Sequence, residues 1–113
     1  MMTKQTYINR MHALDRAVVA VGENDEPKGI ITFFITDTPD KVERNGIWGI
    51  PKENAKGKYL VIDRVISDRK TSVRNNLLGV IEYFNKRFSD KEVVWQSRNK
   101  GLICPKEKIC ATH

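Results

Sequence analysis

Apolar residues in this chain gather in short runs rich in Val, Ile and Phe, separated by polar stretches. Three such runs occupy residues 16–22, 29–36 and 59–67, and a shorter one occupies residues 92–96. Runs of this length and composition predict β-strands. The first two are joined by turn-forming residues, GENDEPKG, and are expected to pair as a β-hairpin. Because both are apolar at successive positions, their strands should be covered on both faces.

Apolar residues at helical spacing predict two helices. The short one lies in residues 3–14, and its apolar face consists of Tyr7, Ile8, Met11 and Leu14. The long one begins near residue 71, with Thr71 or Ser72 as its N-cap. Its apolar stripe consists of Val73, Leu77, Val80, Ile81, Phe84 and Phe88. Gly79 costs this helix about 1 kcal/mol relative to Ala, which suggests close packing on the sheet at that position.

The order of these elements predicts a single α/β domain over residues 1–113. Residues 59–67, the long helix and residues 92–96 form a β-α-β unit, so the two strands should be parallel neighbours. The sheet is then mixed, with a β-hairpin, a central strand, a long packed helix and a following parallel strand. Residues 101–110 are expected to begin a helix or to form an irregular tail, and Pro105 disfavours a helix that continues through it.

Residues 37–58 have the composition of a loop, with prolines, glycines and many charges. Ile47, Trp48 and Ile50 make its middle too apolar for a purely solvated linker. Two interpretations are open. The tip folds onto the core, which we favour, or it contacts a substrate or a partner.

Asp63 and Arg64 interrupt the apolar run at residues 59–67. Successive strand residues point to opposite faces, so one of the two charges is expected to face the core or a cleft. A charge in such a place needs a partner or a wet cavity. Asp63 is therefore either one half of a structural ion pair or a carboxylate placed as a general base.

The net charge of +6 and the pI near 9.5 favour phosphate-bearing partners. Trp48, Tyr59 and Trp95 could stack on bases, but acidic residues interleave the basic ones, which disfavours nucleic acid as the partner. No run approaches the roughly 20 apolar residues of a membrane span. The first residues lack a signal-peptide pattern, so a cytoplasmic protein is expected. The C-x5-C spacing of Cys104 and Cys110 predicts two reduced thiols and no metal site.

A strand that leads directly into a helix N-terminus is a common phosphate-binding arrangement. Here that segment reads LVIDRVISDRKTS followed by VRNNLLGVIEYF. Together with the hairpin AVVAVGENDEPKGIITFFIT, it resembles the central part of the GCN5-related N-acetyltransferase (GNAT) superfamily. Members of that superfamily carry a turn of the form Arg/Gln-x-x-Gly-x-Gly/Ala before the helix. Alignment on the paired leucines matches the turn to residues 69–74, whereas alignment on Val65 starts it at Lys70.

The resemblance implies an acetyl-CoA cofactor whose acetyl group is transferred to an amine. The backbone of the turn and of the helix start would hold the pyrophosphate, helped by Arg69, Lys70 and Arg74. The pantetheine would run along Val65 and Ile66, and Asp63 would be the nearest candidate base. The other cofactor-binding positions that the resemblance implies are Thr71, Ser72, Val73 and Asn99.

The turn differs from the family pattern because both of its glycines are replaced by larger residues. The chain also stops before the final strands of a full-length member, and no tyrosine follows Tyr83, where the family often has an acid. Two functions therefore stay open. The chain is an N-acetyltransferase acting on an amine, or it is a catalytically inactive accessory or basic binding protein. A homodimer that supplies the missing strands is compatible with either.

Overall fold

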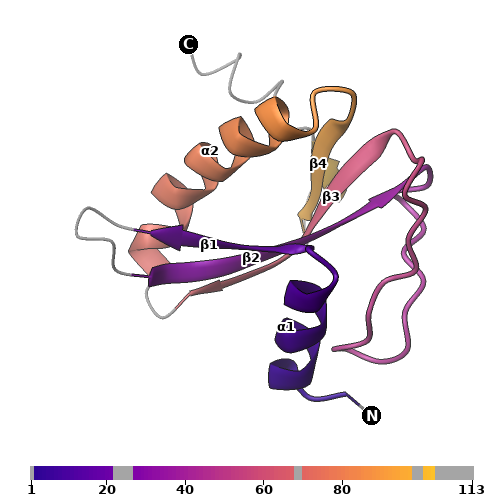
Figure 1. Cartoon of the computed structure of the whole chain (residues 1–113), viewed down its shortest axis with the longest axis horizontal. Helices are drawn as coiled ribbons and strands as arrows, with labels where there is room; N and C mark the ends of the chain where they lie inside the picture. Colours follow the sequence, from indigo (N-terminus) through magenta and orange to yellow (C-terminus); the bar gives the residue numbers. More distant parts are fainter. Residues whose placement is uncertain (1, 22–26, 68–69, 98–100, 104–113) are drawn as a thin grey trace.

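The computed structural model describes residues 2–21, 27–67, 70–97 and 101–103. The elements follow one another as α1 (Lys4–Ala13), β1 (Ala17–Val21), β2 (Pro27–Thr36), β3 (Tyr59–Ser67), α2 (Lys70–Arg87), β4 (Glu92–Ser97) and β5 (Gly101–Ile103). Figure 1 shows a central sheet with α2 on one face and α1 on the other. Within the described residues, neither helix combines the length and the apolar character that crossing a membrane requires.

The described strands form one mixed sheet in the order β1-β2-β3-β4-β5. β1 and β2 form the antiparallel hairpin, β3 pairs antiparallel with β2, and β4 lies parallel to β3. This confirms the predicted α/β class, the hairpin and the β-α-β unit. The prediction for residues 101–110 was wrong for the first three of them, because Gly101–Ile103 pairs antiparallel with β4 as a short strand. Residues 104–110 lie outside the described residues.

The larger part of the core lies between the sheet and α2. Alternate residues of β2 and β3 face this helix, as the two-residue period of a strand requires. Phe84 is fully buried, and its ring lies 4.6 Å from that of Phe33. The other buried members of this cluster are Ile31, Leu60, Ile62, Val80, Ile81 and Val93. Burial of these residues confirms the part of the predicted helical stripe for which side chains are described.

The opposite face of the sheet is covered by α1 and by the loop at residues 37–58. Tyr7 and Met11 are buried, whereas Leu14 ends the helix with 56% of its surface exposed. A smaller cluster on this face consists of Phe34, Val61 and Val94, with Val42 and Tyr59 packed against it. β2 is thus covered on both faces, as expected. β1 is not, because Val19 on this edge strand is 52% exposed.

Two expectations for α2 were wrong. The helix already includes Lys70, so neither Thr71 nor Ser72 is its N-cap. A Cβ atom at Gly79 would meet nothing within 4 Å, so this glycine faces open space and not the sheet. The buried stripe continues at Val80, Ile81 and Phe84, which turns the preceding residue toward solvent.

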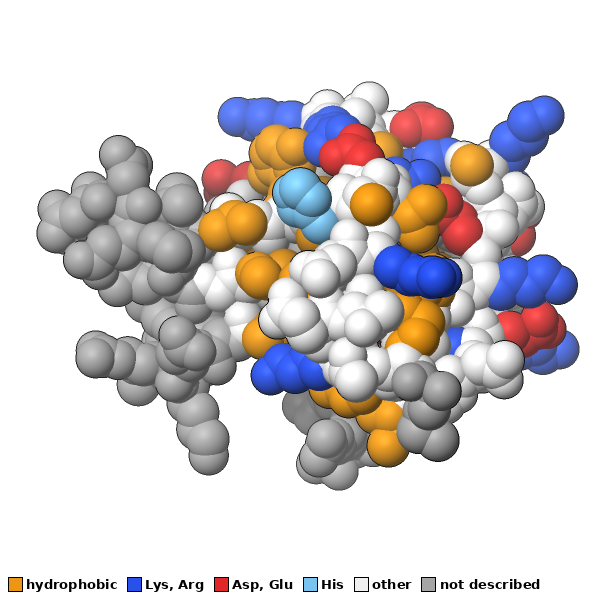
Figure 2. Space-filling model, turned by 60° about the horizontal axis from the view of Figure 1, so that its bottom comes forward, with side chains coloured by type: hydrophobic (Ala, Val, Ile, Leu, Met, Phe, Trp, Pro, Cys, Tyr) orange, Lys and Arg blue, Asp and Glu red, His pale blue; other side chains and the backbone are white. Residues whose placement is uncertain are grey.

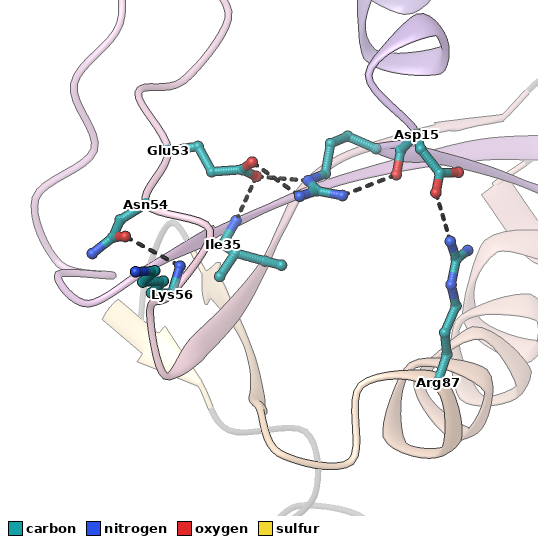
Figure 3. A network of polar contacts seen from close by, with 7 residues as sticks. Asp15, Ile35, Glu53, Asn54, Lys56 and Arg87 are labelled. Carbon is teal, nitrogen blue, oxygen red and sulfur yellow. Dashed lines mark hydrogen bonds and ion pairs between the residues drawn. The ribbon is translucent and has the colours of Figure 1, made fainter.

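The loop at residues 37–58 is tied to the sheet by a polar network (Figure 3). Arg16 binds both carboxylate oxygens of Glu53 at 2.7 and 3.0 Å, and Glu53 also accepts the backbone N–H of Ile35 at 3.0 Å. Arg87 at the end of α2 donates to Asp15 at 2.6 Å. These contacts join the loop, the connection between α1 and β1, β2 and α2.

The tip of the loop folds onto the molecule, as we favoured. The Trp48 ring lies 5.5 Å from the ring of Tyr7, whereas Ile47 points outward with 73% of its surface exposed. Gly57 is required where the loop returns, because a Cβ atom there would lie 2.3 Å from the Thr36 carbonyl carbon. The apolar tip is therefore split into one half-buried aromatic ring, packed against Tyr7, and one exposed side chain.

Candidate functional site

A bulge in β3 sets the geometry around Asp63. In the pairing of β2 with β3, Thr32 lies opposite Arg64 and Phe33 lies opposite Ile62, so Asp63 is the extra residue. Directly paired residues share a face of the sheet, which puts Arg64 on the face of Thr32. Asp63 also lies on this face, where it contacts Tyr7 and Arg44. The expectation that Asp63 and Arg64 point to opposite faces was therefore wrong, because a bulge breaks the two-residue alternation.

The Asp63 carboxylate is nearly buried and fully engaged. Its side chain is 4% exposed, and both of its oxygens accept from the Arg44 guanidinium, Nη1 lying 3.1 Å from Oδ2. The Tyr7 hydroxyl donates to Oδ2 as well. This is the geometry of the structural ion pair, the first of the two roles considered for Asp63. The role of general base stays a prediction.

Tyr7 links this ion pair to β2. Its hydroxyl lies 2.6 Å from Thr32 Oγ1, which in turn accepts the backbone N–H of Arg64 at 3.1 Å. Burial, followed by the hydrogen bond to Asp63, raises the pKa of the Tyr7 phenol above its ordinary value. The hydroxyl is thus held protonated as a donor to the carboxylate.

Arg64 contacts the tip of the loop on the same face of the sheet. Its guanidinium lies 5.1 Å from the centre of the Trp48 ring and donates to the Ile47 carbonyl at 2.7 Å. Its Nε atom is buried and has no hydrogen-bond partner within the described part of the chain. Trp48 is therefore in contact with Tyr7 on one side and with a cationic group on the other.

The two parallel strands separate at the level of Asp63. Their ladder joins Tyr59–Ile62 of β3 to Glu92–Trp95 of β4. β3 then continues to Ser67 along β2, whereas the last residues of β4 pair with β5. α2 begins at Lys70, soon after β3 ends. Figure 1 shows β3 running on toward the start of α2, past the end of β4.

Some of the predicted cofactor-binding residues lie near this opening, and others lie outside the described residues. Val65, 38% exposed, and the half-buried Ile66 lie in the part of β3 beyond its ladder with β4. Lys70, Thr71, Ser72, Val73 and Arg74 form the first turns of α2. Arg69 and Asn99 lie outside the described residues, as do Cys104 and Cys110. Among the predicted site residues, Asp63 is thus the one whose side-chain hydrogen-bond partners are described on both oxygens.

Sequence reasoning missed Tyr7 and Arg44 as the partners of Asp63. The need for a partner was predictable, because a carboxylate inside an apolar strand must be paired. Its identity was not, because Tyr7 belongs to the apolar face of α1 and Arg44 is one of many loop charges. Among the described residues, no group of three or more His, Cys, Asp or Glu side chains is arranged to hold a metal ion.

Comparisons of the chain with models of protein families, with curated proteins and with solved structures gave no match. The resemblance to the GNAT superfamily therefore stays a prediction based on the sequence motifs.

Proposed function

We propose that this chain is an acetyl-CoA-binding domain that transfers the acetyl group to an amine acceptor. The observation that carries the proposal is the separation of β3 from β4 after Ile62 and Trp95, next to the start of α2. Backbone polar groups that leave a ladder need other partners. The amides of a pantetheine chain are suitable partners, because they pair with a strand edge as a peptide does.

The start of α2 supplies the second half of the proposed cofactor site. The first N–H groups of a helix have no partner within the helix and favour a phosphate. Lys70 and Arg74 belong to the first turns of α2, where cations add attraction for a pyrophosphate. The absence of glycine in this turn limits how closely the backbone can approach the phosphates, so we expect the side-chain charges to contribute a large share of the affinity.

In the proposed reaction, the acceptor amine loses a proton to a base and attacks the thioester carbonyl of the cofactor. The bound cofactor supplies an activated acyl group and a thiol leaving group. Asp63 lies in the bulge where β3 leaves β4, which makes it the candidate base. To accept a proton from an amine, Asp63 has to become more accessible, because its side chain is 4% exposed and Arg44 and Tyr7 already occupy three of its roughly four lone-pair positions.

That requirement supports a second candidate, a protein that binds acyl-CoA without turning it over. The observation in its favour is the full engagement of the Asp63 oxygens in a side chain that is only 4% exposed. Loss of one partner of such a buried pair destabilises a fold whether or not the carboxylate takes part in chemistry. The two candidates share the cofactor site and differ only at Asp63.

Calorimetric titration with acetyl-CoA and with CoA tests the cofactor site. We expect binding by the wild type and at least about tenfold weaker binding after Lys70→Glu combined with Arg74→Glu. Lys41→Glu combined with Lys52→Glu is the matched control, because it also reverses two charges, both on exposed residues of the loop. Absence of heat at millimolar cofactor overturns the proposal, and equal losses in both variants contradict the assigned location.

Release of CoA thiol in the presence of amines then separates the two candidates. For an active enzyme, Asp63→Asn should abolish thiol release while leaving the affinity for CoA unchanged. Cofactor binding without thiol release across a broad set of amines supports the non-catalytic alternative.

A further inference from the structure

An open cavity of about 630 Å³ lies between α1 and the tip of the loop. Its described lining consists of Met2, Arg10, Asn45, Gly46, Gly49 and Ile50. A volume of this size is typical of sites for small molecules. The lining is mixed, with two apolar side chains, one amide, one guanidinium and two glycines, so it matches a ligand that is apolar in one part and anionic in another.

Arg10 gives the cavity its charge. Among the described residues that line it, none is acidic, and no ion pair of Arg10 is found in the described part of the chain. A guanidinium offers paired N–H donors that fit a carboxylate. The amide of Asn45 adds a neutral donor and acceptor beside it. Met2 and Ile50 supply apolar surface for the rest of the ligand.

The loop wall of the cavity is fixed in shape. Gly46 has a φ of 79°, a backbone conformation that favours glycine. Gly49 donates to the Gly46 carbonyl at 3.3 Å, and a Cβ atom on it would lie 2.2 Å from the Asn45 carbonyl oxygen. The wall is therefore a tight turn that brings backbone close to the ligand space and does not have to be ordered on binding.

The two elements that build the cavity, α1 and the loop, also carry the partners of Asp63. Tyr7, which donates to Asp63, is three residues before Arg10 on α1, so the two side chains are neighbours on the helix surface. Arg44, which binds Asp63, directly precedes Asn45 in the cavity wall. Tyr7 and Arg44 thus lie between the cavity wall and Asp63, which is not among the lining residues.

We propose that this cavity binds the carboxylate of the acceptor, and that the acceptor is an α-amino acid with an apolar side chain. The inference rests on the proposed function for the identity of the ligand as an acceptor. Arg10 holds the carboxylate, Met2 and Ile50 contact the apolar side chain, and the amine lies toward Asp63. Arg10 is then a specificity-determining residue and takes no part in proton transfer.

The test uses leucine and leucinamide as a matched pair of probes, with binding to the full chain followed by NMR in the absence of cofactor. We expect leucine to bind, and leucinamide to bind at least about tenfold more weakly because it lacks the carboxylate. Arg10→Gln should reduce leucine binding to the same extent, whereas Lys4→Gln removes a charge from the same helix and should leave it unchanged. Equal binding of the two probes overturns the proposal. Equal effects of the two variants, or no leucine binding at about 10 mM, overturn it as well.

Calorimetry with CoA on the same variants keeps this inference separate from the proposed function. Arg10→Gln is expected to bind CoA with unchanged affinity, because Arg10 lies on α1 and not at the start of α2. A chain that binds leucine through Arg10 but does not bind CoA supports the cavity assignment and refutes the acetyltransferase proposal. A chain that binds CoA but shows no Arg10-dependent leucine binding refutes the cavity assignment alone.

Discussion

Replacing Arg44 by Met should destabilise the protein far more than replacing any exposed cation of the loop. Arg44 is the ionic partner of Asp63, and its side chain is 17% exposed while that of Asp63 is 4% exposed. Met keeps an unbranched apolar chain that can fill the space of the arginine stem. The substitution therefore removes the charge and the donors with little loss of packing, and it leaves the Asp63 carboxylate buried without its cation.

The size of the effect follows from the burial of the pair. Removing one partner of a buried ion pair costs about 3–5 kcal/mol, because the remaining charge is uncompensated. Arg44 is not fully buried, and the Tyr7 hydroxyl still donates to Asp63, so we expect the lower end, about 3 kcal/mol. With a urea m-value of about 1.5 kcal/mol/M, this loss lowers the unfolding midpoint by about 2 M.

Urea unfolding followed by far-UV circular dichroism and by tryptophan fluorescence measures this shift. Lys52→Met is the matched control, because Lys52 and Glu43 form an exposed pair at 3.7 Å with exposures of 80% and 72%, and such pairs contribute about 0–1 kcal/mol. A double-mutant cycle that adds Asp63→Asn should show that the two losses are not additive. Equal midpoint shifts for the Arg44 and Lys52 variants would show that the Asp63 ion pair is not held as described.

Three further predictions concern positions away from this pair. Gly79→Ala should raise the free energy of unfolding by about 1 kcal/mol, since its Cβ meets nothing within 4 Å; a lower melting temperature would contradict this. Gly57→Ala should lower the melting temperature, because its Cβ would lie 2.3 Å from the Thr36 carbonyl carbon and overpacking costs about 1–3 kcal/mol. The pKa of Tyr7 is raised in the folded state, so its contribution to stability is complete below the ordinary pKa of 10.0 and is lost as the pH rises above it. Unfolding free energies measured at several alkaline pH values should fall by up to about 1.4 kcal/mol per pH unit more in the wild type than in Tyr7→Phe.

The sequence was sufficient for the elements whose pattern is local and repeated. Four apolar runs and one helical stripe predicted the hairpin, β3, β4 and α2, because burial on a sheet or a helix face follows the period of the element. β5 was missed because Gly101–Ile103 is a three-residue strand, too short for any period to emerge. Its strand conformation depends on pairing with β4. That partner cannot be identified from the three residues alone.

The candidate site was less predictable because its residues come from distant parts of the chain. Asp63 stood out as a charge within an apolar run, but its partners lie 56 and 19 residues away in sequence. Tyr7 has the spacing of a core residue, and it is one, yet its hydroxyl also reaches the carboxylate. Gly79 illustrates the opposite error, because a glycine in a helix was interpreted as a packing requirement and faces open space.

The bulge at Asp63 explains why one short segment can serve both the core and the candidate site. In a regular strand, Ile62 and Arg64 would share a face, and the guanidinium would enter the apolar cluster of Phe33 and Phe84. The extra residue moves Arg64 to the other face, where it contacts Trp48, and leaves Asp63 to contact Tyr7 and Arg44. A bulge also increases the local twist of its strand, and the ladder between β3 and β4 ends at the residue before it. The same extra residue thus places Asp63 in the buried ion pair and marks the point where the two parallel strands separate.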